Sequence, residues 1–174
     1  TRVMTCGDTL TYCVTITPSG GTVVYEWTIV GGTITTPPGA SCVTVKAGTA
    51  TEFTLHLKAT RNNALCVIEC ERSVPVGSPK AEIYAINATR VLSCGDTATY
   101  CATVTPSTGT ITYEWTITGG AIETSPSQSC VRVRADGGSF TLHLKVARNN
   151  ALCIAEADKT VPIDAPSCAV TPFD

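Results

Sequence analysis

Charged residues are scarce in this sequence, at 15% of 174 residues, and neither sign dominates. The net charge is -2 and the pI is near 5.6, so we expect no basic surface for nucleic acid. The 14 acidic residues are scattered, which excludes an acidic tail. No apolar run approaches the ~20 residues that a membrane-spanning helix requires, so we expect no membrane insertion.

Catalytic motifs are missing as well. The sequence has no Ser/His/Asp order, no paired-carboxylate spacing and no glycine-rich phosphate loop. Its two histidines, His56 and His143, stand one in each half of the chain in a TLHLK string, whereas a metal site needs several converging ligands. We therefore predict a protein that is not an enzyme and that has no cofactor or metal.

What the sequence does contain is an internal repeat. The segment TRVMTCGDTLTYCVTITPSGGTVVYEWTI begins at Thr1, and TRVLSCGDTATYCATVTPSTGTITYEWTI begins at Thr89. Thr, Val and Ile dominate both copies, polar and apolar residues alternate, and turn residues recur about every eight to twelve positions. This pattern predicts two all-β modules, each an antiparallel sandwich around one tryptophan, Trp27 or Trp115.

The strings YEWTIVGGTI (residues 25–34) and YEWTITGGAI (residues 113–122) resemble the polycystic-kidney-disease-type (PKD-type) Ig-like repeats of microbial surface proteins. The resemblance covers each module and implies a non-catalytic, cell-surface domain. The predicted fold is therefore two tandem Ig-like or PKD-like β-sandwiches.

The end of the sequence looks like the first strand of a module. An extended apolar segment, AEIYAIN (residues 81–87), precedes the second copy. The string VPVGSPKAEIYAIN aligns without a gap on VPIDAPSCAVTPFD at the end of the sequence. We expect the first sandwich to lack its own first strand and residues 168–174 to have the register of that strand.

These observations predict the domain organisation of the chain. We expect a first sandwich with an open edge at residues 1–76, a linker at 77–80, a second sandwich at 81–163 and a C-terminal donor strand at 164–174.

Ten cysteines are many for a chain of this length, and most occupy matching positions in the two copies. This usage favours disulfides and an oxidising compartment. A zinc site would call for closely spaced pairs, and the nearest pair is Cys66 with Cys70. We expect a secreted or cell-surface protein, and a sequence that begins at Thr1 is typical of a mature, processed form.

The faces on which the cysteine side chains lie reduce the number of possible disulfide pairings, although sequence alone does not fix the pairing. Cys13 and Cys42 both fall on outward faces of strands that would be neighbours, so a cross-strand bridge is feasible. The other matched cysteines are then paired by elimination. The predicted intrachain disulfides are Cys13–Cys42, Cys101–Cys130, Cys6–Cys66 and Cys94–Cys153.

Cys70 and Cys168 remain, and their matching positions in the other copy are Ala157 and Ala81. First and last strands of such sandwiches can run side by side in parallel, so we predict a Cys70–Cys168 bridge that holds the tail on the first module. The tail could return to its own first module or enter that of another molecule. The short linker and an extended exit at Pro166 favour the second option.

The predicted function is a structural subunit of an extracellular filament, a head-to-tail homopolymer in which each chain donates its last strand to the next. Val170 and Phe173 are the predicted donor-strand contacts. This logic resembles that of microbial pili and threads. The alternative is an adhesin or carbohydrate-binding segment of a larger secreted repeat protein, with a surface glycan or cell-surface ligand. Asn87 begins an Asn-Ala-Thr pattern for N-glycosylation.

Overall fold

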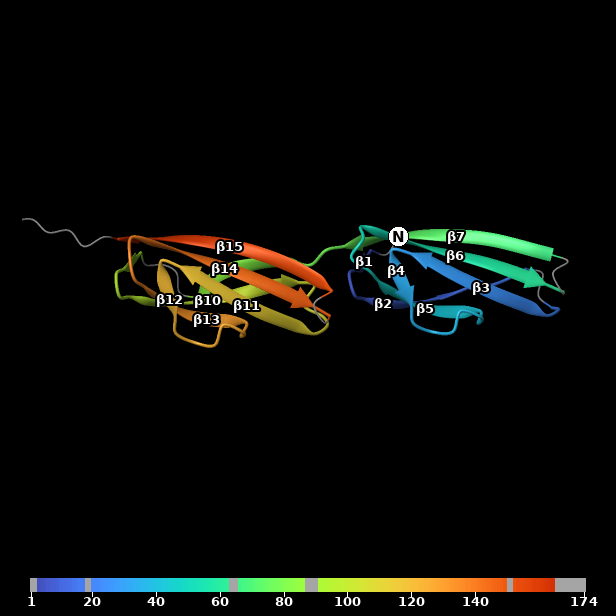
Figure 1. Ribbon diagram of the computed structural model, residues 1–174, viewed down its shortest axis with the longest axis horizontal. Helices are drawn as coiled ribbons and strands as arrows, with labels where there is room; N and C mark the ends of the chain where they lie inside the picture. The colour runs from blue at the N-terminus through green and yellow to red at the C-terminus, as the bar shows by residue number, and fades with distance from the viewer. Residues whose placement is uncertain (1–2, 18–19, 63–65, 87–90, 150–151, 165–174) are drawn as a thin grey trace, which may run out of the picture. The chain divides into compact units, whose positions relative to one another are not determined.

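The computed structural model of the chain describes residues 3–17, 20–62, 66–86, 91–149 and 152–164 (Figure 1). Every regular element in these ranges is a β-strand. The chain divides into two compact units, each a sandwich of two sheets. Unit 1 comprises Thr1–Pro79 with Arg148–Cys153, and unit 2 comprises Lys80–Ala147 with Ile154–Asp174.

The first repeat forms two sheets, in the orders β1-β7-β6-β3 and β2-β5-β4. Neighbouring strands pair antiparallel, except that β1 runs parallel to the end of β7, with Met4 opposite Val76. The bounds are β1 Met4–Thr5, β2 Thr9–Cys13, β3 Val23–Val30, β4 Gly32–Ile34, β5 Cys42–Ala47, β6 Glu52–Arg61 and β7 Cys66–Gly77.

The second repeat forms sheets in the orders β11-β14-β15-β9 and β12-β13-β10-β8. Here β9 runs parallel to the end of β15, with Leu92 opposite Ile163, as β1 does along β7. The bounds are β8 Lys80–Ile86, β9 Leu92–Ser93, β10 Thr97–Thr105, β11 Ile111–Thr118, β12 Gly120–Ile122, β13 Cys130–Ala135, β14 Ser139–Arg148 and β15 Cys153–Asp164.

Alternating side chains build the core of each sandwich. In β6, Phe53, Leu55 and Leu57 are buried, and the residues between them lie on the outer face. Trp27 and Trp115 are buried at matching places. The indole Nε1 of Trp27 donates a hydrogen bond to the Ala40 carbonyl oxygen at 2.9 Å, which satisfies the polar atom that burial would otherwise leave without a partner. Trp115 bonds to Gln128 in the same way.

The Gly-Gly pair of the YEWTI string has a steric role. Gly31 and Gly119 both have a positive φ, of 81° and 83°. A Cβ on Gly31 would meet the carbonyl oxygen of Glu52, and a Cβ on Gly119 would meet that of Ser139. Only glycine allows this tight passage from β3 to β4 and from β11 to β12.

The fold prediction is confirmed: the chain is two tandem antiparallel β-sandwiches of Ig-like type. One expectation about strand pairing is wrong. The strand ahead of the second repeat, β8, hydrogen bonds antiparallel to β10, and the parallel partner of β15 is the short β9. β8 and β9 therefore belong to different sheets of the second repeat.

Candidate functional site

The sheets that contain β2 and β10 differ at one edge. β10 lies between two strands, β13 and β8, and its pairing with β8 runs from Thr99 opposite Ile86 to Thr105 opposite Lys80. In the first repeat, β2 occupies the same place, but among the described residues its only strand partner is β5. We call the side of β2 away from β5, with the segment that follows it to residue 17, the open edge.

The apolar side chains of β10, which β8 pairs with, are more buried than the matching side chains of β2 and the segment after it. Tyr100 and Val104 of β10 are buried, whereas the matching Tyr12 and Ile16 are only half-buried. Tyr100 and Phe140 form an edge-to-face pair with ring centroids 5.7 Å apart, and burial raises the pKa of the Tyr100 phenol. The absence of a strand beside β2 in the described residues therefore leaves apolar side chains of unit 1 partly exposed to water.

The opposite sheet of unit 1 is also uncovered at this side. Cys70 lies opposite the buried Leu57 in the β6–β7 ladder, so it shares the inward face of the sheet, and yet it is exposed. Ile68 lies on the same face and is 44% exposed, whereas its counterpart Ala155 is 9% exposed. The open edge and this face of β7 form one region, since the Arg72 guanidinium lies over the Tyr12 ring at 6.0 Å from its centroid.

In unit 2 the corresponding region is filled by β8. A groove of about 830 Å³ remains there. Ala85 and Ile86 of β8 line one side, and Lys159 and Thr160 of β15 line another. Ala81, Ile83 and Ala85 pack on the core of the unit. β8 thus closes the edge of its sheet and lies near β15 of the opposite sheet.

The structure joins Cys13 to Cys42 and Cys101 to Cys130, each with Cα atoms 4.0 Å apart. These are the two cross-strand pairs that outward facing favours. Cys13 is directly opposite Cys42 in the β2–β5 register, and the second pair is directly opposite in β10 and β13.

The other two predicted bridges are corrected by the structure. Cys6 is joined to Cys153, with Cα atoms 5.9 Å apart, and neither Cys6–Cys66 nor Cys94–Cys153 forms. The reason is the parallel register of β1 and β7. Met4 lies opposite Val76, so Cys6 is at the end of β7 that is roughly 33 Å from Cys66, at ~3.3 Å per residue.

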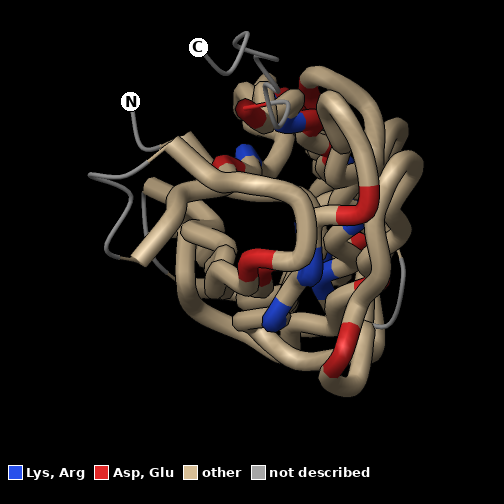
Figure 2. The backbone as a smooth tube through the Cα atoms, turned by 90° about the vertical axis from the view of Figure 1, so that its left-hand side faces the viewer, with Lys and Arg blue, Asp and Glu red and all other residues tan. Residues whose placement is uncertain are grey.

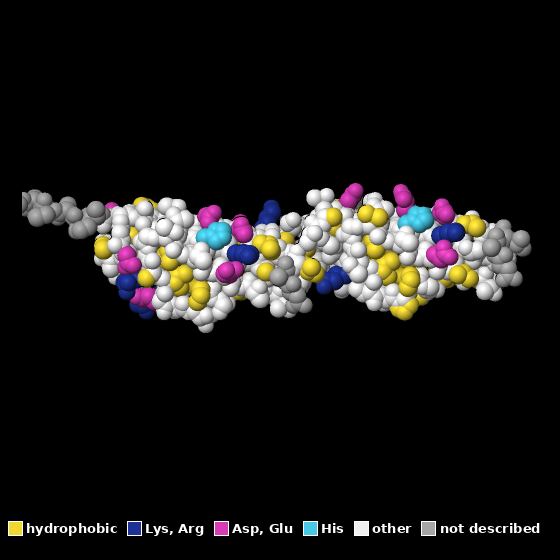
Figure 3. All heavy atoms as spheres, viewed as in Figure 1, with side chains coloured by type: hydrophobic (Ala, Val, Ile, Leu, Met, Phe, Trp, Pro, Cys, Tyr) yellow, Lys and Arg dark blue, Asp and Glu magenta, His cyan; other side chains and the backbone are white. Residues whose placement is uncertain are grey.

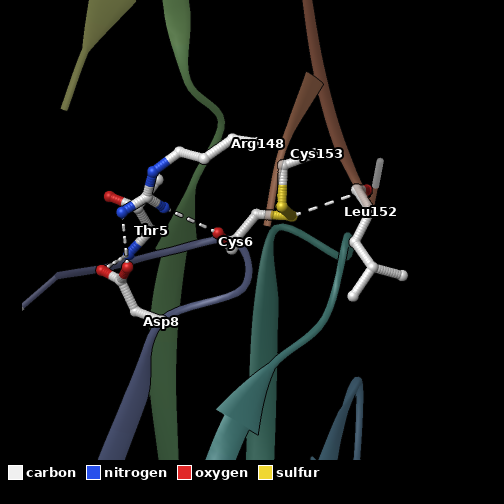
Figure 4. Close-up of a disulfide and its surroundings, with 6 residues drawn as sticks. All are labelled: Thr5, Cys6, Asp8, Arg148, Leu152 and Cys153. Atoms are coloured by element: carbon white, nitrogen blue, oxygen red, sulfur yellow. Dashed lines mark hydrogen bonds and ion pairs between the residues drawn. A yellow bond between two sulfur atoms is a disulfide. The ribbon is translucent and has the colours of Figure 1, made fainter. Parts of the chain in front are cut away.

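The Cys6–Cys153 disulfide lies in a buried polar site of unit 1 (Figure 4). The Arg148 side chain is only 1% exposed. Its Nη1 donates to the Cys6 carbonyl oxygen at 3.0 Å and its Nη2 to Asp8 Oδ1 at 2.8 Å. The other carboxylate oxygen of Asp8 accepts a bond from the Thr5 amide at 3.1 Å. A buried guanidinium thus has both a carbonyl and a carboxylate acceptor. Nothing in the one-dimensional pattern marks Arg148 as buried.

The remaining cysteines within the described residues, Cys66, Cys70 and Cys94, are free thiols and are exposed. Several predicted site residues lie outside the described residues, so the structure says nothing about them. They are Asn87, Cys168, Val170 and Phe173.

Charged side chains are sparse, and the two signs are interspersed along the backbone (Figure 2). Each unit has one histidine on its surface with lysine and acidic side chains nearby (Figure 3). His143 Nδ1 lies 2.7 Å from Asp158 Oδ1, and Lys145 lies 3.7 Å from Glu114. In the part of the chain that the structure describes, no three His, Cys, Asp or Glu residues converge as a metal site, and no helix is suited to cross a membrane.

Comparison with known proteins agrees with this architecture. Residues 79–163 match the family model of the PKD-like domain. No curated protein matches the chain. Similar solved structures include the fibronectin(III)-like modules of Clostridium thermocellum CbhA, with 13% identity, 99% of this chain and 94% of that chain covered, and a TM-score of 0.39.

Two further solved structures are similar to the chain. The three N-terminal domains of the bacteriophage RB49 outer capsid protein Hoc have 12% identity, coverage of 94% and 56%, and a TM-score of 0.45. The D00-D0 domain of intimin has 12% identity, coverage of 94% and 96%, and a TM-score of 0.38. At such identities a likeness concerns the fold alone. The chain is a pair of tandem Ig-like β-sandwich repeats, and its second repeat is similar to the PKD-like domain family.

Proposed function

We propose that this protein is a structural subunit of an extracellular filament that assembles head-to-tail. In this assembly the C-terminal strand of one molecule, residues 168–174, pairs with the open edge of the first repeat in the next molecule. The observation that carries the proposal is the contrast between β10, which β8 covers along seven residue pairs, and β2, whose described partner is β5 alone.

The physical argument is strand addition. An open edge presents backbone N–H and C=O groups that a further strand can pair with, and here it also leaves Tyr12 and Ile16 half-buried. An added strand would satisfy the backbone groups and cover the apolar side chains at once. In the sequence alignment the tail matches β8, and Val170 corresponds to Ile83, a residue packed on the core of unit 2.

Phe173 and Cys168 of the tail also match residues of β8 whose surroundings the structure describes. Phe173 matches Ile86, which is 44% exposed and lines the groove beside β15, so Phe173 would cover the equivalent groove of unit 1, while Val170 would pack on the core. Cys168 matches Ala81, and Cys70 is an exposed thiol on the inward face of β7. A Cys70–Cys168 disulfide would therefore make each junction covalent.

The direction of the chain favours donation to another molecule. β7 ends at Gly77 and β8 begins at Lys80, so the strand that completes the second repeat follows the first repeat almost directly. The tail follows β15 through the equivalent segment, which contains Pro166. Because the donor and acceptor surfaces differ, the contact is heterologous and continues from molecule to molecule. Disulfide-bonded sandwiches of this kind are typical of secreted and surface proteins.

The alternative, an adhesin or carbohydrate-binding segment, receives less support. Glycan-binding surfaces usually present exposed aromatic rings. Among the large exposed hydrophobic side chains of the described residues, Tyr84 is the one aromatic.

The test is a comparison of the whole chain with a chain that ends at Pro166, both reduced so that no disulfide contributes. Light scattering and electron microscopy measure assembly. A third protein, Val170→Asp, keeps the length of the tail and places a charge where the apolar side chain would enter. We expect filaments from the whole chain and none from the other two.

A Cys168→Ser variant separates strand donation from covalent locking. Made in a Cys66→Ser background, which removes the other exposed thiol of β7, it should still assemble, but its filaments should dissociate to monomers on a non-reducing denaturing gel. Filaments from the chain that ends at Pro166 would refute the proposal, and so would a whole chain that stays monomeric at high concentration.

A further inference from the structure

Each repeat has one cysteine at each end of its sandwich. The parallel pairing of β1 with the end of β7 places the Cys6 turn beside Val76 and Gly77, and Cys66 begins the same strand at its other end. The second repeat is built alike. Leu92 lies opposite Ile163, so the turn that contains Cys94 is at the end of β15 and Cys153 is at its beginning. Cys6 and Cys66 therefore lie too far apart to bond to each other, and the same holds for Cys94 and Cys153.

The turn that contains Cys94 is a copy of the turn that contains Cys6. The Gly7 amide donates to the Ala47 carbonyl at 2.9 Å, and the Gly95 amide donates to the Ala135 carbonyl at 2.8 Å. In each copy the aspartate carboxylate accepts a bond from the amide three residues earlier, at 3.1 Å for Asp8 and 2.9 Å for Asp96.

The two turns differ in whether another segment of the chain packs on them. A Cβ on Gly7 would meet the side chain of Asn149, whereas a Cβ on Gly95 would meet nothing within 4 Å. Cys6 is buried in its disulfide, and Cys94 is an exposed free thiol.

The segment that covers the Cys6 turn also has a copy. Arg148, Asn149 and Cys153 of the second repeat correspond to Arg61, Asn62 and Cys66 of the first. The two asparagines have nearly the same left-handed backbone, with φ of 53° for Asn149 and 51° for Asn62. Cys153 is buried in the disulfide, while Cys66 is exposed and free.

We infer that Cys94 of one molecule forms a disulfide with Cys66 of the next, in a second copy of the site around Cys6 and Cys153. The order of repeats supports this pairing. The existing bridge joins the Cys6-type cysteine of one repeat to the Cys66-type cysteine of the repeat that follows it. The inference rests on the head-to-tail succession proposed above, in which the first repeat of a second copy follows the second repeat of the first.

The same equivalence assigns roles around this bridge. Arg61 of the second copy would donate to the Cys94 carbonyl and to Asp96, as Arg148 does to Cys6 and Asp8. Asn62 would pack on Gly95. Cys70 is not an alternative partner for Cys66, because four residues of extended strand separate their Cα atoms by roughly 13 Å, beyond the ~7 Å limit for a disulfide.

Formation of the bridge is a two-electron oxidation. A thiolate of one cysteine attacks a small-molecule disulfide such as oxidised glutathione and releases one glutathione thiol. The second cysteine, as thiolate, then attacks the protein sulfur of the mixed disulfide and releases the second glutathione thiol. One S–S bond is lost and one is gained, the oxidant is reduced to two thiols, and the two cysteine protons pass to the buffer and the leaving thiolates.

The test uses the full chain with Cys70→Ser and Cys168→Ser, so that no other intersubunit bridge can form, in a glutathione redox buffer. Non-reducing gels measure covalent oligomers, and mass spectrometry of unreduced peptides identifies the linkage. We expect a ladder of oligomers and a peptide that joins Cys66 to Cys94. In an equal mixture of ¹⁴N and ¹⁵N chains, about half of these peptides should contain one chain of each label.

Two single variants in the same background test the pairing of unlike ends. Cys66→Ser alone and Cys94→Ser alone should each remain monomeric on the gel, and their mixture should give a covalent dimer and nothing larger. Like-with-like dimers from either variant alone would overturn the inference, and so would free thiols at both positions in an assembled filament.

Failure of the inference is distinguishable from failure of strand donation. If filaments form only when the residues after Pro166 are present, but the Cys66–Cys94 peptide is not found, the disulfide inference is refuted and strand donation is not. A chain that ends at Pro166 and still forms that peptide sinks strand donation and leaves the disulfide in place.

Discussion

Asp8 accepts a hydrogen bond from the buried guanidinium of Arg148, so a substitution of Asp8 tests how much this contact stabilises unit 1. We predict that Asp8→Ala destabilises the protein much more than Asp96→Ala, although the two aspartates occupy the same turn in the two repeats. Both substitutions remove a bond from a backbone amide, Thr5 for Asp8 and Ser93 for Asp96. Only Asp8→Ala also removes a carboxylate from a side chain that is 1% exposed.

The magnitudes follow from these contacts. Loss of the amide bond costs about 1 kcal/mol in either variant. Loss of the 2.8 Å bond from Arg148 adds about 2 kcal/mol, near the low end for a bond to a charged group, because the Asp8 side chain is 36% exposed and water replaces part of the interaction. The expected losses of unfolding free energy are therefore about 3 kcal/mol for Asp8→Ala and about 1 kcal/mol for Asp96→Ala.

Urea unfolding with the disulfides intact measures the difference. Trp27 reports on unit 1 in a Trp115→Phe background, and Trp115 reports on unit 2 in a Trp27→Phe background, so that each aspartate variant is measured in its own unit. Each variant is compared with the same tryptophan background. Equal losses for the two variants, within about 0.5 kcal/mol, would refute the argument that Asp8 supports a buried charge.

Three other predictions concern separate parts of the molecule. Digestion without reduction should yield a peptide that joins Cys6 to Cys153, and the chain with both replaced by Ser should lose up to about 5 kcal/mol, because the bridge closes a loop across 147 positions; a stability unchanged in denaturant would contradict this. Because burial raises the pKa of Tyr100 above its ordinary value of 10.0, the folded state favours the neutral phenol. Its contribution to stability should be full below pH 10 and should fall as the pH rises through the raised pKa, a loss that Tyr100→Phe should remove from the pH profile of urea unfolding. Gly31→Ala should cost more than about 1 kcal/mol, and Gly39→Ala should be near neutral, since a Cβ at position 39 meets no atom within 4 Å; equal melting temperatures would contradict the steric argument.

Local pattern was enough to predict the sandwiches. Alternation places Phe53, Leu55 and Leu57 on one face of a strand whatever lies far away in the chain, and the structure buries all three. The same reasoning placed Cys13 and Cys42 on outward faces of neighbouring strands, where the structure joins them. Such features depend on side-chain direction and on the pairing of adjacent strands, which a sequence with period-2 alternation expresses directly.

Pairing the remaining matched cysteines by elimination gave wrong disulfides. That reasoning did not consider where along its strand each cysteine lies. Cys6 and Cys66 have matching partners in the second repeat and look like a pair, but the parallel register of β1 and β7 puts them at opposite ends of one sandwich. That register joins residues far apart in sequence, and no periodic signal encodes it. The same holds for Arg148, whose burial depends on the Cys6 carbonyl and Asp8 being brought to it.

The sequence by itself thus determined the repeat, which a comparison of its two halves shows, and the strands and the faces of their side chains, which depend on short local patterns. Tertiary structure alone decided which cysteines meet, which strand covers which edge and which charge is buried. These outcomes depend on contacts between residues such as Cys6 and Cys153, which are 147 positions apart.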